Sequence, residues 1–403
     1  MNARIIDAKD FIRPELVNKS TIEETVKTIL QDIQENGDSS VNYWSQKIDG
    51  QKAQLISLKP FEEYDLTSEL SQSIKFAYNR IKTFCKFQIK NLNNDSFKDN
   101  IGEFGYIYQP IERIGAYIPG GKFPLISTAL MTLTPAQVAN CPVRIACSPS
   151  AHPALLAAAS LAGATEFLHL GGAQAIGALS FGFERIKPVN MIAGPGNAYV
   201  NTAKAQVQHH TKIDTLAGPS ELLIFANELK NPDWIVLDAL AQAEHDPNAI
   251  SLVVSTSQQL LENIYTLTKS SKEGASLLEK EQILFILTES NDQAIELIND
   301  YTPEHLLVCD PEFNTSQLTN YGSLFIGENS AVAFGDYCAG PNHTLPTNGA
   351  GKNSGGLSVH QFLKVLSTQR VSDTGISELA KYSAALAQAE GLIFHQQSCE
   401  VRN

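Results

Sequence analysis

The residues that could carry out chemistry gather in four short segments of the sequence. In LAQAEHDPNA, Leu240 to Ala249, an apolar helical pattern suddenly carries Gln242, Glu244 and His245. Gln242 and His245 are three positions apart and would share one face of a helix, whereas Glu244 would point elsewhere. The other three segments also combine a histidine with a carboxylate, and they are YTPEHLLV (Glu304, His305), FGDYCAGPNHTLPT (Asp336, Asn342, His343) and AQAEGLIFH (Glu390, His395).

Taken one at a time, these side chains have ordinary structural interpretations: a satisfied histidine, a solvated strand edge, an aspartate in a turn. Their combination favours chemistry. Glutamine, histidine and aspartate together make a nitrogen and oxygen site suited to zinc, or to manganese or cobalt. One carboxylate leaves about one positive charge of a divalent ion uncancelled, so such a site would favour neutral nitrogen donors from a substrate.

A second kind of signal is rich in glycine. Glycine permits tight turns and a close approach of the backbone to a ligand, and each turn leads into a predicted helix whose N-terminus favours an anion. None of the segments reads GxGxxG, so the pattern alone predicts only phosphate or cofactor loops. The segments are YIPGG (Tyr117 to Gly121), GGAQAIGAL (Gly171 to Leu179), AGPGNAYVN (Ala193 to Asn201) and AGPSE (Ala217 to Glu221).

Composition excludes several classes of protein. The chain has 403 residues, 43% apolar and 18% charged, with a formal charge of -13. No Lys/Arg cluster offers a basic face to nucleic acid, and no apolar run reaches the roughly 18 residues that cross a membrane. The N-terminus lacks an apolar signal core, and the six cysteines contain no CxxC pair. We therefore expect a cytoplasmic protein without a disulfide framework or a thiolate zinc site.

The elements that must position these residues indicate an α/β protein. Residues 20–37 predict an amphipathic helix, and from Tyr117 onward short apolar runs alternate with helical patterns, which is typical of βαβ units. We expect two Rossmann-like layered domains with an incomplete dinucleotide fingerprint, and helical extensions at both ends. The expected division is 1–20 (N-terminal extension), 21–115 with 221–366 (first α/β domain, metal and substrate site), 116–220 (second α/β domain, cofactor loops) and 367–403 (C-terminal helical tail). The tail is too short to bury a core of its own, so it should pack on another surface, such as a second subunit.

Together these motifs resemble the histidinol dehydrogenase family, which catalyses the last two steps of histidine biosynthesis. The resemblance runs in the family's order from YIPGG through GGAQAI, GPGN, AGPSE, AQAEHDP, PEHL and GDY..GPNH.LPT to the C-terminal EG...H. It implies a zinc- and NAD-dependent homodimer with one zinc ion per subunit, in which the extensions serve dimerisation and the tail completes the partner's site. L-Histidinol would be the substrate.

The resemblance also assigns roles to residues of this chain. It places the family's acid/base pair on Glu304 and His305. It places the zinc ligands on Gln242, His245, Asp336 and His395, and the NAD contacts on Tyr117, Gln174 and Asn197. Substrate contacts fall on Ser220, Gln242, His245, His305, Asp336, His343, Glu390 and His395.

The implied chemistry is two successive oxidations at one site. His305 would accept the hydroxyl proton of histidinol in the first, and Glu304 would activate water at the aldehyde in the second. A thiohemiacetal on Cys338 is an alternative for the second step, although an apolar filler is the more ordinary role for this thiol. Two other classes stay open: a zinc hydrolase with Glu304 as base, and a metal-dependent binding protein without catalysis.

Overall fold

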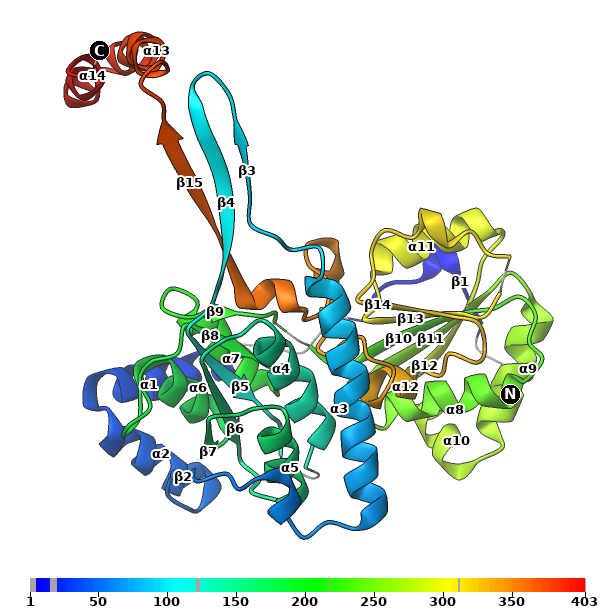
Figure 1. Ribbon diagram of the computed structural model, residues 1–403. Helices are drawn as coiled ribbons and strands as arrows, with labels where there is room; N and C mark the ends of the chain where they lie inside the picture. The colour runs from blue at the N-terminus through cyan, green and yellow to red at the C-terminus, as the bar shows by residue number, and fades with distance from the viewer. Residues whose placement is uncertain (1–4, 15–19, 121–123, 217, 311, 403) are drawn as a thin grey trace.

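The computed structural model describes residues 5–14, 20–120, 124–216, 218–310 and 312–402. These residues form two lobes, each a six-stranded sheet between helices, and an arm that projects away from both (Figure 1). The expected α/β class is confirmed. Within this described part of the chain, no helix combines the length and apolar character that a bilayer span requires.

The first lobe is built on a sheet whose strands are all parallel, in the order β1-β12-β11-β10-β13-β14. Its strands are β1 (Ile5–Asp7), β10 (Glu221–Phe225), β11 (Ile250–Ser255), β12 (Ile283–Leu287), β13 (His305–Val308) and β14 (Ser323–Ile326). Along β10, Leu222 and Ile224 face one helical layer and Leu223 and Phe225 the other, as the two-residue repeat of a strand dictates. One layer holds α8 (Pro232–Ala243), α9 (Gln258–Lys269), α10 (Lys272–Glu279) and α12 (Val332–Tyr337), and the other holds α11 (Asn291–Tyr301).

The second lobe has the order β2-β7-β6-β5-β8-β9, and its strands are parallel apart from β2, which pairs antiparallel with β7. Its strands are β2 (Gln54–Ile56), β5 (Arg113–Tyr117), β6 (Val143–Ser148), β7 (Glu166–His169), β8 (Met191–Ala193) and β9 (Lys212–Ile213). Both faces of this sheet are apolar and covered, which is usual for parallel strands. One face carries α1 (Ser20–Asn36), α2 (Asp38–Asp49), α6 (Gly172–Phe181) and α7 (Ala198–Val207), and the other carries α3 (Ser68–Ile89), α4 (Ile126–Val138) and α5 (Pro153–Leu161).

The arm is a small antiparallel sheet with two helices at its end (Figure 1). β4 (Gly102–Pro110) pairs with β3 (Asp95–Lys98) on one side and with β15 (Leu363–Val371) on the other. The chain then forms α13 (Ile376–Ala389) and α14 (Ile393–Glu400) at the tip, and the C-terminus lies there. Short 3-10 turns complete the described elements, at Ala8–Asp10, Phe61–Glu63, Thr315–Gln317, Ala350–Lys352 and Val359–Phe362.

Three details differ from the sequence-based expectations. Residues 21–115 were expected to group with residues 221–366, but β2 and β5 belong to the second sheet and α1, α2 and α3 pack on it. A helical pattern shows which face is apolar and not which sheet that face covers. The described part of the N-terminal extension begins with strand β1 and a 3-10 turn rather than a helix. In the tail, residues 367–371 belong to β15, because pairing with β4 overrides their local pattern.

Candidate active site

Glu304 and His305 lie at the amino edge of the first sheet. Leu222 of β10 is opposite His305 of β13, so Glu221 and Glu304 are neighbours where the two strands begin. The backbone N–H of Glu221 donates to Oε2 of Glu304 over 2.9 Å, and Nδ1 of His305 lies 3.3 Å from the carbonyl oxygen of Glu221. Because a carbonyl oxygen only accepts, this contact assigns a proton to Nδ1 of His305.

Two carboxylates face the buried ring of His305. Its Nδ1 lies 3.5 Å from Oε2 of Glu304, and its Nε2 lies 3.5 Å from Oδ1 of Asp336. Burial lowers the pKa of His305, but Glu304 and Asp336 outweigh burial and raise it to about 10. In this arrangement His305 carries a positive charge at neutral pH and can give up a proton rather than take one. Neutralising Asp336 would bring the pKa of His305 down again.

Asp336 and His343 are joined through the loop that follows α12. Nδ1 of His343 donates to the backbone carbonyl of Asp336 over 2.8 Å, and Nε2 lies 3.2 Å from the hydroxyl of Thr128 in α4. The first contact fixes the proton on Nδ1, so Nε2 of the neutral ring accepts from Thr128. Burial lowers the pKa of His343, which agrees with the neutral ring. Asn342 donates to the carbonyl of Met131 over 2.5 Å, so this loop of the first lobe is docked on α4 of the second.

Gln242 and His245 lie at the C-terminal end of α8, near Asp336. Gln242 is 2% exposed, and its Nε2 has no hydrogen-bond partner among the described residues. His245 follows the helix and is exposed. Burial raises the pKa of Asp336, but His305, His343 and His245 outweigh it and hold the pKa below its ordinary value. His245 therefore lies close enough to Asp336 to act on its carboxyl group.

Two buried or partly buried carboxylates fix α8 and α12 against each other. Glu328, in the segment before α12, accepts from the backbone N–H groups of Lys230 and Asn231 at the start of α8, each over 2.9 Å. In return, Asp238 of α8 accepts from the backbone N–H of Val332 at the start of α12. The relative position of Gln242 and Asp336 is set by these reciprocal contacts.

Glu390 and His395 are not brought to this site within one chain. Glu390 ends α13, His395 lies in α14, and both are exposed at the tip of the arm (Figure 1). In keeping with this, no group of three or more His, Cys, Asp or Glu side chains in the described part of the chain could hold a metal ion.

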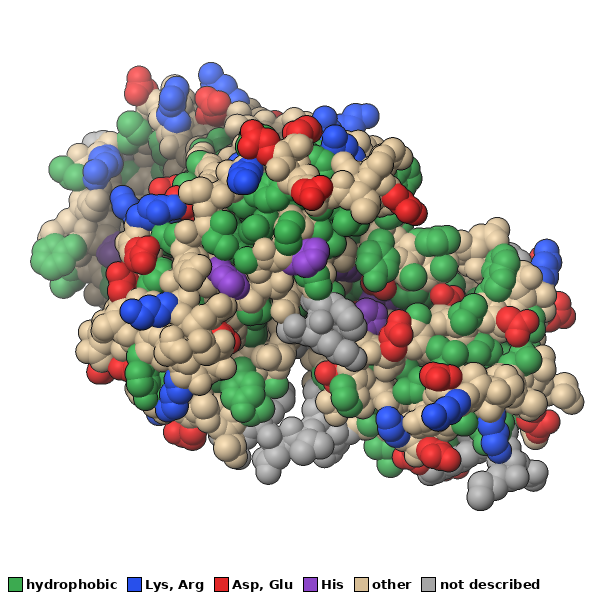
Figure 2. Space-filling view, turned by 90° about the horizontal axis from the view of Figure 1, so that it is seen from below, with side chains coloured by type: hydrophobic (Ala, Val, Ile, Leu, Met, Phe, Trp, Pro, Cys, Tyr) green, Lys and Arg blue, Asp and Glu red, His purple; other side chains and the backbone are tan. Residues whose placement is uncertain are grey.

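A pocket of about 380 Å³ opens beside His305 and His343. Its walls include Phe325, Phe334 and Asn342, so a ring-shaped or apolar group could lie next to the polar cluster. Ser220 precedes β10 at the same edge, and its carbonyl accepts from Ile250 over 3.1 Å. Figure 2 shows histidine side chains near the line where the two lobes meet, on a surface where acidic and basic groups are mixed.

The three residues expected to contact NAD lie at the carboxyl edge of the second sheet. The chain leaves β5 for β6 on one side and returns to β8 on the other, which makes the ends of β5 and β8 a topological switch point where α/β sheets bind ligands. Tyr117 ends β5, and its hydroxyl accepts from the N–H of Gly172 over 3.3 Å. Gln174 is fully buried and donates to Asp49 over 2.9 Å, while Oε1 of Gln174 lacks a partner among the described residues.

Asn197 is the exposed member of these three residues. Its side chain caps α7 by accepting from the N–H of Val200 over 3.1 Å, so it lies at a helix N-terminus suited to an anion. Gly121 and Ala217, at the ends of two predicted glycine-rich segments, lie outside the described residues.

A buried ion pair holds the loop before Asn197. Nζ of Lys204 lies 2.5 Å from Oδ1 of Asp214, and both side chains are almost completely buried. Lys204 also donates to the carbonyl of Gly194 over 2.9 Å, and the N–H of Gly194 donates to Asp214 over 2.7 Å. Gly194 has φ +120°, and a Cβ there would lie 2.0 Å from the carbonyl oxygen of Tyr117. Only glycine lets the loops after β5 and β8 approach this closely.

The structure supports the apolar role for Cys338. Its side chain is partly buried against the core of the second lobe, and burial raises the pKa of its thiol. A thiol with a raised pKa is a poor nucleophile at neutral pH.

The sequence interpretation missed Arg13 and Glu221. Glu221 was quoted within AGPSE but was not singled out, although a carboxylate that opens the apolar strand ELLIF is an unusual burial. Arg13 forms an ion pair with Glu221 from 208 positions away, and no local pattern could have indicated that contact.

Comparisons with known proteins agree with this arrangement. The sequence profile of the family described as Histidinol dehydrogenase matches residues 13–403. A histidinol dehydrogenase of Thermus thermophilus is 38% identical, over 97% of this chain and 97% of its own length. One from Methanosarcina mazei is 38% identical, over 94% of this chain and 91% of its own length.

Among solved structures, the crystal structure of histidinol dehydrogenase from Elizabethkingia anophelis is similar throughout. It has a TM-score of 0.91 and 32% identity, and the match covers 100% of this chain and 98% of that one. A salicylaldehyde dehydrogenase from Pseudomonas putida G7 has a TM-score of 0.51 at 12% identity, over 88% of this chain and 86% of that one, which shows a likeness of fold alone.

Proposed function

The chain belongs to the histidinol dehydrogenase family, and from this membership we propose that it oxidises L-histidinol to L-histidine through L-histidinaldehyde, with two NAD used per histidine. As a member of this family it is an oxidoreductase of histidine biosynthesis. The observation that carries the proposal is the cluster of Glu304, His305 and Asp336 at the amino edge of the first sheet, beside a pocket that could accept an imidazole ring.

A zinc ion fits the donor set around α8 and α12. Gln242, His245 and Asp336 of one chain would hold it, and His395 of a second copy would complete four ligands. The unpartnered amide of buried Gln242 supports this, because an amide can be turned to present its oxygen. When bound, zinc would orient the amine and imidazole nitrogens of the substrate and, by neutralising Asp336, would lower the pKa of His305 into the range of a base.

The chemistry can then be assigned to side chains. His305 takes the hydroxyl proton of histidinol as the carbinol hydride leaves for NAD. Glu304, held by the N–H of Glu221, next takes a proton from the water that adds to the aldehyde, and the second hydride leaves from the hydrated aldehyde. Ser220 and His343 would contact the substrate from the rim of the site.

NAD fits the carboxyl edge of the second sheet. The N-terminus of α7 at Asn197 would accept a phosphate, and the loops of Tyr117 and Gln174 lie beside it at the switch point. The loop of His343 docks on α4, and this contact brings the two edges toward one another. Location in the cytoplasm and a boundary between the lobes near residue 221 stay predictions.

A homodimer is supported by surfaces that one chain leaves uncovered. The arm has no core, and its strands expose Phe97 (62%), Val365 (62%) and other apolar side chains. At its tip, Leu386 is 67% exposed and Phe394 is 83% exposed.

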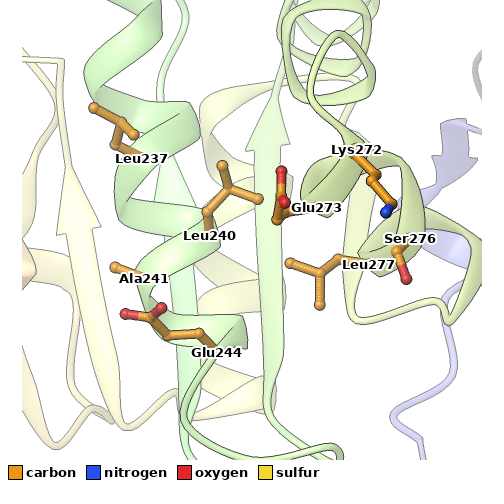
Figure 3. A pocket seen from close by; sticks show the side chains of 8 residues that line it. All are labelled: Leu237, Leu240, Ala241, Glu244, Lys272, Glu273, Ser276 and Leu277. Atoms are coloured by element: carbon orange, nitrogen blue, oxygen red, sulfur yellow. The ribbon is translucent and has the colours of Figure 1, made fainter.

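The first lobe offers a matching surface near the proposed metal ligands. A groove of about 560 Å³ lies between α8 and α10 and is lined by Leu237, Leu240 and Ala241 of α8 and by Leu277 of α10. Figure 3 shows Leu240 pointing toward Leu277 across it. Its wall ends at Glu244, next to His245. We expect the arm and tail of a second copy to cover this region, so that Glu390 and His395 act in trans.

The tail can be tested by complementation. Inactive Glu390→Ala and His305→Ala chains are mixed and refolded together. Partial return of activity is expected, because a mixed dimer would contain one complete site. No return in a mixture shown to contain hybrid dimers would mean that both residues act within one chain.

The activity itself is tested by stoichiometry. Purified protein is given L-histidinol and NAD, and the NADH formed per histidine is measured before and after chelation and after zinc is restored. A ratio of two, lost on chelation and regained with zinc, is expected. Absence of NADH with any metal would overturn the proposal and leave the hydrolytic and binding alternatives.

A further inference from the structure

Arg13 connects the two chain segments that carry Glu304 and His305. Its guanidinium forms an ion pair with Oε1 of Glu221, where β10 begins. The other arm of the fork donates to the backbone carbonyl of Tyr301 over 2.5 Å, at the end of α11 and three residues before Glu304. The guanidinium also lies 4.4 Å from the centre of the Tyr301 ring. The planar fork of arginine suits such a double contact, whereas lysine has a single charged group.

The peptide unit of Glu221 is the common partner of Glu304 and His305. Its N–H donates to the Glu304 carboxylate, and its carbonyl accepts from Nδ1 of His305. The side chain of Glu221 is held at both oxygens, by Arg13 at Oε1 and by the N–H of Asn348 at Oε2 over 3.2 Å. Any shift of Glu221 would therefore move the hydrogen bonds that orient both groups.

We propose that Arg13 is a positioning residue for the reaction: it fixes Glu221 and the end of α11, and through them it sets the orientation of Glu304 and His305. This inference rests on the acid/base roles proposed above. Arg13 lies outside every motif that indicated the family, and it reaches the site from the segment that follows β1.

Arg13 also compensates negative charge close to His305. Glu304 and Asp336 each lie 3.5 Å from a ring nitrogen of His305, and the backbone N–H of Glu221 donates to Glu304. Three carboxylates are therefore close to one imidazole ring. Among the described residues, the ion pairs that they form with lysine or arginine are limited to Arg13 with Glu221. Without that cation, Glu221 would be a buried charge beside Glu304 and would be driven to move or to take a proton.

The test compares Arg13→Met with a matched control. Arg185→Met removes another arginine that forms an ion pair with a glutamate, Glu166, but lies on the second lobe away from the site. The number of L-histidinol sites and their affinity are measured by calorimetry on the zinc-loaded dimer, and kcat is expressed per binding site. In Arg13→Met we expect kcat to fall at least about ten-fold while the affinity for histidinol and the KM for NAD change less than about three-fold, because misplaced groups slow chemistry more than binding. Arg185→Met should match the wild type in all of these values.

A double-mutant cycle shows whether Arg13 acts through Glu221. Glu221→Gln keeps the shape of the side chain and the peptide hydrogen bonds but removes its charge. The loss in Arg13→Met/Glu221→Gln should be close to the larger single loss, because both changes break one interaction. Multiplied losses, an unchanged kcat per site in Arg13→Met, or an equal loss in Arg185→Met would each overturn the inference.

Two further measurements keep the test decisive. If Arg13→Met does not fold, Arg13→Lys is measured in the same way, and a loss of at least about three-fold is expected, because an ammonium group cannot replace the fork. Wild-type kcat in Glu304→Gln and His305→Ala would overturn the acid/base roles themselves. Loss of kcat in those two variants, with none in Arg13→Met, would overturn the role of Arg13 alone.

Discussion

The two lobes have the same strand order and use opposite edges. In each sheet an early strand, β10 or β5, lies inside, the next two strands lie to one side of it, and the last two lie to the other. The second lobe places its candidate ligand contacts at the carboxyl edge, where glycine-rich loops and the N-terminus of α7 lie. The first lobe places its titratable groups at the amino edge, where β10 and β13 begin.

At the carboxyl edge of the first lobe, the loops after β10 and β11 bind one another through a side chain. Oδ1 of Asn227, just after β10, accepts from the N–H of Thr256 over 2.9 Å and from its hydroxyl over 2.8 Å. At the same edge of the second lobe, Gly194, just after β8, has no side chain, and its backbone is held by Lys204 and Asp214. The comparison teaches that sheets with the same strand order can carry a candidate site at the amino edge or at the carboxyl edge. A few residues at each edge decide between them.

The largest effect should come from the amino edge of the first lobe. His305→Ala removes the proposed proton acceptor, so kcat should fall by about 10²- to 10⁴-fold, as general base catalysis typically contributes. Binding of NAD, which belongs to the second lobe, should stay within about three-fold because no contact to that lobe is removed. Steady-state kinetics and NAD titration measure the two effects. His209→Ala, at an exposed position of the second lobe, is the control. A kcat close to that of the control would assign the base to another group.

The opposite experiment acts on the second lobe. Lys204→Met leaves Asp214 buried without its partner, which should lower the free energy of unfolding by about 3–5 kcal/mol. It also frees Gly194, so the KM for NAD should rise while zinc content stays constant. Denaturant unfolding and metal analysis check these outcomes.

A double variant separates the two consequences of that change. Lys204→Met/Asp214→Leu replaces the ion pair by apolar groups and should recover stability, as such replacements often do. It should not restore the KM for NAD, since the N–H and carbonyl of Gly194 have lost their partners. Recovery of both would mean that the ion pair serves the fold alone.

Much of this contrast could be predicted from local sequence. The helix at residues 20–37 and the alternation of strands and helices depend on neighbouring residues, and the structure contains α1 accordingly. The expected shared helical face of Gln242 and His245 is not found, because α8 ends at Ala243 and His245 follows it. The family resemblance added the roles of residues such as Glu304 and His305, which spacing alone left open.

Long-range pairing could not be predicted in the same way. β15 is a strand because it pairs with β4, more than 250 positions earlier in the chain. The ion pair of Arg13 with Glu221 likewise forms only because folding brings the two residues together. The exposed positions of Glu390 and His395 in a single chain follow from the arm, whose own apolar residues are uncovered. Their proposed place in a site would depend on a second copy, and the local sequence pattern carries no information about that contact.

A smaller effect should appear in the pH dependence of stability of the first lobe. Burial raises the pKa of Asp238 from 3.8 to about 6, although the N–H of Val332 opposes the shift. A raised carboxyl pKa means that the folded state binds the proton more tightly, so the charged group destabilises the fold above pH about 6 and this cost disappears as the pH falls toward 3.8.

Asp238→Asn keeps an acceptor for Val332 and removes the charge. It should be more stable than the wild type by about 1–3 kcal/mol at pH 8, with the difference vanishing near pH 4. Denaturant unfolding across this range measures it, and Asp300→Asn, at an exposed side chain, is the control. A difference that does not change with pH would contradict the raised pKa.

The smallest effect separates two roles of Asn197 in the second lobe. Asn197→Ala removes the cap of α7 and should cost about 1 kcal/mol of stability. Asn197→Asp keeps an oxygen that can accept from Val200, so stability should be retained, but it places a negative charge where a phosphate of NAD is expected. The KM for NAD should therefore rise more in Asn197→Asp than in Asn197→Ala, although the aspartate variant is the more stable of the two. If the KM follows stability instead, Asn197 is a helix cap without a role in binding the cofactor. The carboxyl edge would then have to hold NAD through its backbone alone, and the contrast with the side-chain chemistry of the first lobe would be sharper still.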